Sequence, residues 1–531
     1  MSRRPSHTSN HTFSEVPAVQ IPRSSFNRSH TIKTTFDSGD LIPILVDEAL
    51  PGDTFKVRLT AFSRMATPIY PIMDNLFMDV FFFSVPNRLL WDNWEKFCGE
   101  QVDPGDSIDY TVPVLYNGVS NPLNEGSIYD YMGLPTGVGG VQESASSLPF
   151  RAYYRVWNEW FRDQNMQDSV PEARGDGPDY TEIGVPYSVQ KRGKRHDYFT
   201  SALPWPQKGD SVDLPLGQYA PVVSNGNAPS FQSASGGDYG PLYGDNASPY
   251  RVSVDGNAIY GTPAGQMYWD GTGLQADLST ATAATINQLR QAFQVQKLLE
   301  RDARGGTRYV EIIKAHFGVT TPSAGWRSEY LGGGTRMVNI SPIAQTSSTD
   351  STSPQGNLAA MGTATLDGIG FTKSFTEHCT ILGLVNVRAD LTYQQGLNRM
   401  WSRQTRYDFY WPALANIGEQ AILNKEIYFQ GTSDDDDVFG YQERYAEYRY
   451  KPSIITGAFR SNAATPLDSW HLAQDFSSLP ALNSAFIEDN PPVSRVVAVP
   501  SEPEFLFDGY FDMNCVRPMP LYGVPGMVDH F

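Results

Sequence analysis

The sequence has little cysteine. Its 531 residues include only Cys98, Cys379 and Cys515, which lie far apart and form no CxxC pair. That spacing excludes a zinc ribbon, an iron–sulfur cluster and a disulfide framework. We expect three buried free thiols in a protein that matures in a reducing compartment.

Long hydrophobic runs are also missing. The longest apolar run, around residues 80–85, is far shorter than the ~18 residues of a membrane span, and no apolar stretch follows the first arginines. The sequence therefore predicts neither a secreted precursor nor a membrane protein. Charged residues make up only 18% of the chain, but 40% are hydrophobic, which excludes wholesale disorder.

Motifs of catalysis and of cofactor binding are absent. There is no Walker A, GxGxxG, GxSxG or HExxH pattern, and the glycines at 332–334 are followed by Thr335 rather than by the sequence of a phosphate loop. We expect no enzymatic activity and no cofactor. One acidic run resembles a calcium loop, but Phe439 stands where an EF-hand needs glycine, so a solvated loop is favoured over a cation site. The weak metal candidates are Asp434, Asp435, Asp436 and Asp437.

What the sequence does have is abundant glycine, proline and aromatic residues. With 46 Gly, 38 Pro, 28 Tyr, 28 Phe and 10 Trp, it favours β structure with many turns over a helical bundle. Residues 54–62 alternate as a strand with one solvated face, whereas residues 76–85 are too apolar for a solvated face and predict a strand covered on both faces. Further strands are predicted at 41–46, 379–388, 441–450, 454–459, 493–499 and 505–516. Little strand pattern is found between residues 86 and 378, where amphipathic helices are predicted at 285–304 and 309–317.

Residues 205–279 have an unusual composition. They contain 12 Gly and 7 Pro but few aliphatic residues, while aromatic residues remain frequent. Flexible linkers lack such aromatics, and recognition loops are rich in them. We predict an inserted segment that binds a partner or packs on copies of itself, with a surface loop without a ligand as the alternative. Its candidate contact residues are Tyr239, Tyr243, Tyr250, Tyr260, Tyr268 and Trp269.

Positive charge is concentrated at two places in a chain whose net charge is −18. Residues 1–36 carry five cations and one acid, and we predict an extended basic arm there, followed by one domain over 37–531. A second cluster lies at 191–195, close to aromatic residues, as on surfaces that bind single-stranded nucleic acid. The alternative for the arm is a frayed terminus, and the alternative for the cluster is an inter-subunit or solvated loop. The candidate nucleic-acid-facing residues are Arg3, Arg4, Arg23, Arg28, Lys33, Lys191, Arg192, Lys194 and Arg195.

Four ordered motifs resemble a known family. They are residues 78–97, the segment His196-Asp-Tyr-Phe-Thr-Ser-Ala-Leu-Pro-Trp-Pro206, residues 298–309 and residues 522–531. Together they resemble the major capsid protein of microviruses, in the gokushovirus branch, over essentially the whole chain. The resemblance is weakest at 205–279, where that family is variable.

The resemblance implies a mainly β fold, an eight-stranded antiparallel viral jelly roll with long insertions that carry a few helices. It implies a T=1 icosahedral shell of roughly sixty copies around circular single-stranded DNA, assembled in the host bacterial cytoplasm and found in the virion. Residues 205–279 would form a protrusion at the three-fold axes that meets a host receptor, for which a glycan is one candidate. Implied partners are an internal scaffolding protein and a DNA pilot protein.

The charge of the chain adds one expectation of its own. A shell with a charge of −18 on every copy repels a polyanionic genome, so we predict a small basic DNA-binding protein as a further partner, with the arm facing inward. The alternative function from another class is a carbohydrate-binding or carbohydrate-cleaving β-sandwich that stacks sugars on its aromatic segment.

Overall fold

The computed structural model describes residues 22–522 except for 117–122, 139–144, 181–186, 320–324, 348, 350, 352–353 and the parts of 213–285 outside its strands. The chain divides into two compact units. One consists of Met1–Pro206 with Thr307–Phe531, and the other of Gln207–Gly306.

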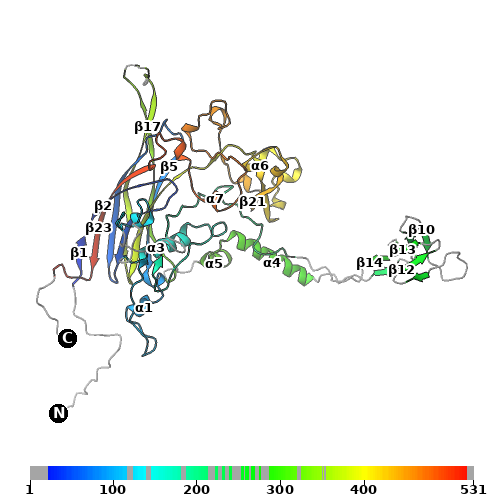
Figure 1. Cartoon of the computed structure of the whole chain (residues 1–531), viewed down its shortest axis with the longest axis horizontal. Coiled ribbons are helices and arrows are strands. Elements are labelled where there is room, and N and C mark those ends of the chain that lie inside the picture. Colours follow the sequence, from blue (N-terminus) through cyan, green and yellow to red (C-terminus); the bar gives the residue numbers. More distant parts are fainter. Residues whose placement is uncertain are drawn as a thin grey trace, which may run out of the picture. The chain divides into compact units, whose positions relative to one another are not determined.

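Two antiparallel sheets form the framework of the first unit (Figure 1). The four-stranded sheet has the order β15 (Glu329–Met337), β5 (Leu76–Pro86), β18 (Cys379–Ala389) and β3 (Ile42–Ala49). In the six-stranded sheet β1 (Ser24–Asn27) and β2 (His30–Phe36) both pair with β23 (Phe505–Arg517), followed by β4 (Thr54–Met65), β17 (Leu358–Ser374) and β16 (Asn339–Ala344).

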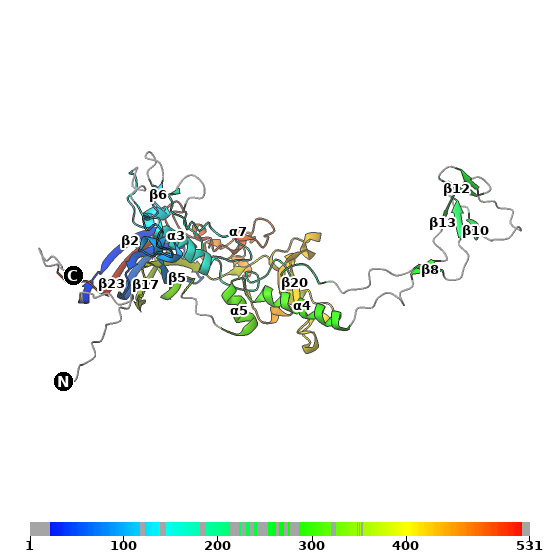
Figure 2. The same ribbon diagram turned by 90° about the horizontal axis from the view of Figure 1, so that it is seen from below.

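The main core lies between these sheets. Phe82 of β5 is fully buried, with ring centroids 5.4 Å from Phe371 of β17 and 6.4 Å from Phe511 of β23. On the other face of the four-stranded sheet, Phe83 belongs to a second core with side chains of α3 (Leu148–Val156), which packs on β5 and β18 (Figure 2). Strand β5 is therefore covered on both faces, as its predominantly apolar sequence predicts.

The six-stranded sheet has one face toward solvent. Buried and exposed residues alternate along β4 and β23, which confirms the prediction of a strand with one solvated face at 54–62. The mainly β, antiparallel fold class is confirmed, and the arrangement is consistent with an eight-stranded jelly roll.

Long connections join the framework strands. In the described residues they contain three two-stranded pairs: β6 (Leu115–Tyr116) with β7 (Asp179–Tyr180), β19 (Thr392–Tyr393) with β22 (Ser453–Ile454), and β20 (Glu419–Leu423) with β21 (Val438–Glu443). Their helices are α1 (Trp94–Phe97), α2 (Ile128–Tyr131), α3 with the π-helical turn η3 (Trp157–Phe161), α5 (Tyr309–Phe317), α6 (Asn424–Ile427) and α7 (Ser484–Ile487).

The second unit contains short strands and one long helix. A five-stranded sheet has the order β10 (Asp238–Pro241), β9 (Ser230–Ser233), β13 (Gly265–Trp269), β12 (Ala258–Gly261) and β11 (Ser253–Asp255). Strand β14 (Leu274–Ala276) pairs with β8 (Val222–Ser224), and α4 (Ile286–Arg304) follows. Both helices predicted from periodicity, α4 and α5, are confirmed. No helix in the described part of the chain is long and apolar enough to cross a membrane.

The prediction of little strand structure before residue 379 is wrong, because β15, β16 and β17 lie there. These strands are rich in glycine and alanine, which have low β propensity. Their small size is needed for packing: a Cβ on Gly333 would lie 2.2 Å from the Val80 carbonyl oxygen, and one on Gly370 would lie 1.9 Å from that of Val57. Close approach of neighbouring strands, invisible in the sequence, selected these residues.

Several other local predictions are corrected. The strand predicted at 441–450 is confined to β21, that at 454–459 to the two residues of β22, and residues 493–495 form a 3₁₀ turn. Residues 24–36, assigned to the basic arm, are strands β1 and β2. Cys379 and Cys515 are buried as expected, but Cys98, just after α1, is exposed.

Candidate interaction surfaces

The basic cluster at 191–195 packs against the framework. Lys191 Nζ lies 3.0 Å from Asp40 Oδ1. Arg192 forms an ion pair with the buried Asp79 of β5, and its guanidinium lies 5.1 Å from the centre of the Phe81 ring. Two of the cations predicted to face nucleic acid are thus already paired within the chain.

The other two cations of the cluster differ in exposure. Lys194 is partly buried, donates a 2.6 Å hydrogen bond to the Phe486 carbonyl oxygen and lies over the Phe486 ring, and desolvation lowers the pKa of its amine. Arg195 keeps 65% of its side chain exposed, with Asp390 4.0 Å away. Within the cluster, Arg195 is the side chain best placed to meet an external ligand.

Asp79 is the acid on which this packing depends. Burial opposes its charge, but hydrogen bonds from Thr335, Arg192 and Arg388 outweigh that cost and hold its pKa below the usual range. The carboxylate therefore remains charged at neutral pH and joins two strands to the 191–195 segment.

The cations near the N-terminus also have partners inside the chain. Arg28 pairs with Asp47 at 2.8 Å, and Lys33 of β2 with Asp508 of β23 at 2.7 Å. Arg23 donates to Thr54 Oγ1 at 3.2 Å. These contacts attach β1 and β2 to the sheet. The remaining two predicted residues, Arg3 and Arg4, lie outside the described residues.

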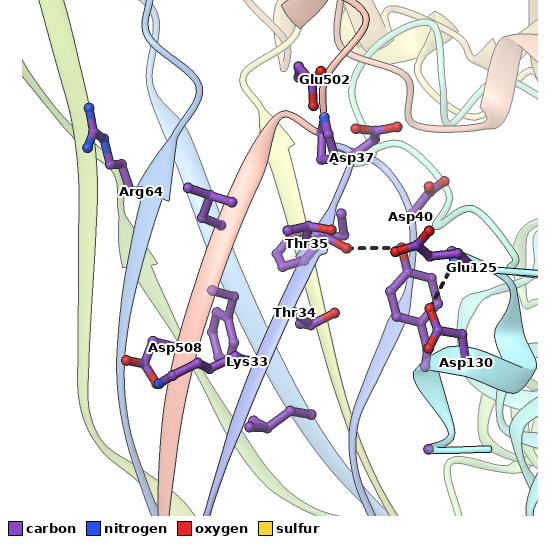
Figure 3. Close-up of a pocket in the computed structure, with 18 of the residues that line it drawn as sticks. Lys33, Thr34, Thr35, Asp37, Asp40, Arg64, Glu125, Asp130, Glu502 and Asp508 are labelled. Atoms are coloured by element: carbon purple, nitrogen blue, oxygen red, sulfur yellow. Dashed lines mark hydrogen bonds and ion pairs between the residues drawn. The ribbon is translucent and has the colours of Figure 1, made fainter. Parts of the chain in front are cut away.

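A groove of about 1170 Å³ runs beside β2 (Figure 3). The Tyr131 hydroxyl donates to the Thr35 carbonyl oxygen of β2 at 3.0 Å, and burial with the charges of nearby acids raises the pKa of Tyr131 to about 12. Two cations, Lys33 and Arg64, line the groove together with six acids, Asp37, Asp40, Glu125, Asp130, Glu502 and Asp508. The excess of acids gives the groove a negative potential, which favours a cationic ligand.

The acidic run at 434–437 has a structural role. It lies in a 3₁₀ turn, Ser433–Asp436, where the buried Asp435 accepts hydrogen bonds from the backbone N–H groups of Gln430 and Gly431 at 2.9 and 2.7 Å. Asp436 pairs with Lys425 at 2.6 Å. Among the described residues no group of three His, Cys, Asp or Glu side chains could hold a metal ion.

The candidate contact residues of the insertion lie partly on its five-stranded sheet. Tyr239 is on β10, Tyr260 on β12, and Tyr268 and Trp269 are on β13, next to β12. The backbone therefore places four of the six predicted residues in one sheet. Tyr243 and Tyr250 lie outside the described residues.

A buried polar network, most of it in the segment that connects β18 to β23, was not predicted from the sequence. Arg399 Nη1 lies 3.0 Å from Glu426 Oε1, and the Tyr198 hydroxyl donates to Glu426 Oε2 at 3.0 Å. Burial raises the pKa of Glu426, while the Arg399 charge opposes this effect. Arg403 adds a 3.3 Å contact to Glu447. No spacing in the sequence could have predicted this network, in which Tyr198 and its partner Glu426 are 228 residues apart.

A β-sandwich whose connections are as extensive as its strands, with paired charges and no metal-binding group in its described residues, has the features of a structural protein that presents large surfaces. The comparison with protein families makes the class specific. The model of the capsid protein (F protein) family matches residues 14–527, and the chain belongs to that family.

Relatives of known identity support the assignment over the whole length. The chain is 50% identical over 535 residues to capsid protein VP1 of Bdellovibrio phage phiMH2K, with 98% of each chain covered. It is 44% identical to capsid protein VP1 of Chlamydia phage 1 and 38% identical to that of Spiroplasma virus 4, with 97% of each chain covered in both cases. The protein is therefore a structural capsid protein of a virion and not an enzyme, as the resemblance implied.

Proposed function

We propose that this chain assembles into a T=1 icosahedral shell of roughly sixty copies that encloses circular single-stranded DNA, and that the insertion contributes to attachment to the host. The observation that supports this proposal most directly is the match to capsid protein VP1 over 98% of both chains. Assembly would occur in the host bacterial cytoplasm, with an internal scaffolding protein and a DNA pilot protein as partners.

The charge distribution supports an additional basic partner for the genome. The chain carries −18, and Lys191, Arg192, Arg28 and Lys33 are all engaged in ion pairs with its own acids. Few of the nine candidate nucleic-acid-facing cations are then left for the phosphates of DNA, so a small basic DNA-binding protein would supply the counter-charge. Arg3, Arg4, Arg23 and Arg195 are the predicted positions from which the chain itself would contribute.

The insertion is the proposed attachment element. Its aromatic residues, glycines and short strands are a composition suited to adaptable recognition of a receptor such as a glycan. Membership of the capsid family removes the support for the alternative of a carbohydrate-cleaving sandwich.

One experiment separates these parts of the proposal. Phage carrying the intact gene, or a gene in which residues 205–279 are replaced by a short Gly/Ser bridge, would be produced in host cells and purified by sedimentation. Both should yield particles of the T=1 size with nuclease-protected circular single-stranded DNA and a small basic protein, and the deletion should lose adsorption.

Each part has its own contradicting result. Shells of another symmetry, or shells without DNA or a basic protein, from the intact gene contradict the shell and genome proposals. Normal plaque formation by the deletion phage contradicts the attachment role. Failure of the deletion phage alone to assemble would show that the insertion carries contacts between copies instead.

A further inference from the structure

Besides Phe429 and Tyr450, six aromatic side chains are exposed in the connection between β18 and β23, which is coloured yellow to orange in Figure 1. They lie on or beside the 3₁₀ turns η4 (Arg399–Trp401), η5 (Arg406–Asp408), η6 (Pro412–Leu414) and η8 (Ala446–Tyr448). Their exposed fractions run from 44% for Trp411 to 71% for Trp401. We name as the aromatic patch Trp401, Tyr407, Phe409, Tyr410, Trp411 and Tyr448.

The patch is large for a surface that faces only solvent. A whole aromatic side chain offers about 200 Å² of surface, so six that are about half exposed offer roughly 600 Å². That area is at the upper limit of the largest apolar patch on a typical monomer, and it approaches the ~800 Å² that each partner contributes to a standard protein interface.

Buried contacts hold the rings in place from below. Tyr445 is 4% exposed, and its ring centroid lies 5.4 Å from that of Tyr410 and 6.3 Å from that of Tyr448. Its hydroxyl donates to the Tyr407 carbonyl oxygen at 3.1 Å. Its φ of 64° is rare for a residue other than glycine. Strained backbone of this kind is kept where the surrounding structure fixes a functional arrangement, so the rings are pre-organised rather than free.

The neighbouring turn is fixed as well. The Asp408 carboxylate accepts hydrogen bonds from the backbone N–H groups of Thr405 at 2.6 Å and Gln404 at 3.0 Å, and these bonds lower its pKa. The Trp411 indole donates to the Arg406 carbonyl oxygen at 2.9 Å. Association with a partner would therefore cost little conformational entropy at this surface.

The cations among the rings indicate the class of partner. Arg403 stacks 4.2 Å from the centre of the Tyr448 ring, but its charge is paired with Glu447 at 3.3 Å. Arg449, which follows the η8 turn, is paired with Glu443. A surface for single-stranded nucleic acid combines its rings with cations left free for phosphates. Two further arginines, Arg406 and Arg444, lie over the Trp411 and Tyr445 rings, 5.0 and 4.9 Å from the ring centres. Aromatic rings stacked with arginines, part of whose charge is paired with acids, are the composition found at the centres of protein interfaces.

We propose that the aromatic patch is a contact surface between copies of this chain within the shell. The inference rests on the proposed assembly, because a capsid protein meets other copies of itself at every boundary of the shell. To that assembly the inference adds the six residues that form one of those boundaries. No pattern in the sequence indicated them.

Hydroxyl-radical footprinting tests the contact on the unaltered protein. Oxidation of Trp401 and Trp411 would be measured by mass spectrometry in unassembled protomers, in empty particles and in DNA-filled particles, with the exposed Phe317 of α5 as a reference site. We expect oxidation of both tryptophans to fall at least fivefold, relative to Phe317, in empty and filled particles alike.

The contradicting results are distinct. Equal oxidation in protomers and particles excludes the patch as a contact. Protection confined to DNA-filled particles assigns it to the genome and overturns the proposal. Failure of the unaltered chain to form particles contradicts the proposed assembly rather than the location of the contact.

Substitution provides a second test. The double variant Trp401→Ser, Tyr407→Ser should lower particle yield at least tenfold while the protomer melts within about 2 °C of the unaltered protein, since the two side chains are 71% and 62% exposed. The conservative pair Trp401→Phe, Tyr407→Phe should restore most of the yield, and Phe317→Ser is the matched control. Normal particle yield from the serine pair, or an equal loss with Phe317→Ser, would overturn the proposal.

Discussion

The two-sheet framework and the connection between β18 and β23 are stabilised in different ways. Between the sheets, the side chains that meet are apolar, as in the contacts of Phe82 with Phe371 and Phe511. In the connection, a buried centre is formed by Arg399 and Glu426. Apolar burial is non-directional, whereas a buried ion pair stabilises only when every partner is in place. The framework thus depends on its apolar pattern. The connection also has an apolar cluster, which includes Ile422, Ile427 and Phe439, but it depends in addition on individual pairings.

The surfaces of the two regions differ in the same sense. The solvent face of the six-stranded sheet alternates single apolar residues such as Phe62 with charged ones. The connection instead gathers the aromatic patch at one place. Scattered exposed apolar residues are normal on a soluble protein, but a contiguous group marks a surface that another molecule covers.

The largest expected effect comes from a substitution in the apolar core between the two sheets. Phe82→Ala should lower the free energy of unfolding of the protomer by about 3–5 kcal/mol, because a fully buried ring between two sheets leaves a cavity. Urea denaturation of unassembled protomers measures it. Phe62→Ala, at a half-exposed position of β4, is the control and should change stability by less than about 0.5 kcal/mol. Similar losses in both variants would refute the picture of a single core between the sheets.

The next effect concerns a buried acid of the connection. Asp489 is 3% exposed, and burial raises its pKa to about 6, although nearby cations such as Lys194 oppose the rise. The folded protein therefore holds this proton up to about pH 6, while the unfolded chain releases it near its ordinary pKa of about 3.9. Its stabilising contribution is complete below pH 4 and is lost as the pH rises through 6, by about 3 kcal/mol in total.

Denaturation at a series of pH values tests this linkage. Relative to Asp489→Asn, the unaltered protomer should lose stability between pH 4 and pH 7, with most of the loss between pH 4 and pH 6. Parallel stability profiles for the two proteins would show that Asp489 titrates alike in the folded and unfolded states.

The smallest effect distinguishes the two buried thiols of the framework from the exposed thiol in another connection, the one that follows β5. Cys379 on β18 and Cys515 on β23 are buried, and burial raises the pKa of Cys379 to about 12, whereas Cys98 is exposed. A maleimide at pH 8.5 should label Cys98 alone in the folded protomer and all three thiols after denaturation. Cys98→Ser should abolish native labelling and change the unfolding free energy by less than about 0.5 kcal/mol. Labelling of Cys379 or Cys515 in the native protein would contradict a closed framework.

The framework was more predictable from sequence than the candidate surfaces. Strands such as β4 and β5 have apolar residues at the positions that a sheet buries, and α4 and α5 have them at the period of a helix. Neighbouring residues in the sequence therefore already show which side chains become buried. Strands β15 and β17 were missed because their glycines serve close approach to other strands, a requirement set by residues far away in the chain.

The cations of the 191–195 cluster show that the role of a side chain also depends on residues far away in the chain. Their composition predicted a nucleic-acid surface, and the assignment remains a proposal for Arg195, but Arg192 and Lys194 are held by Asp79 and by the Phe486 carbonyl. Which acids lie opposite a cation depends on the folded chain, and the sequence does not contain that information in any local pattern.

By itself, therefore, the sequence determined the mainly β class, both faces of β5, the two long helices and, through its motifs, the resemblance to a capsid protein family. Tertiary structure alone decided the groove beside β2, the network around Glu426 and the aromatic patch. The physical reason is that apolar periodicity acts over neighbouring residues, whereas ion pairs, close glycine contacts and exposed ring clusters arise between segments that are brought together only when the sheets have formed.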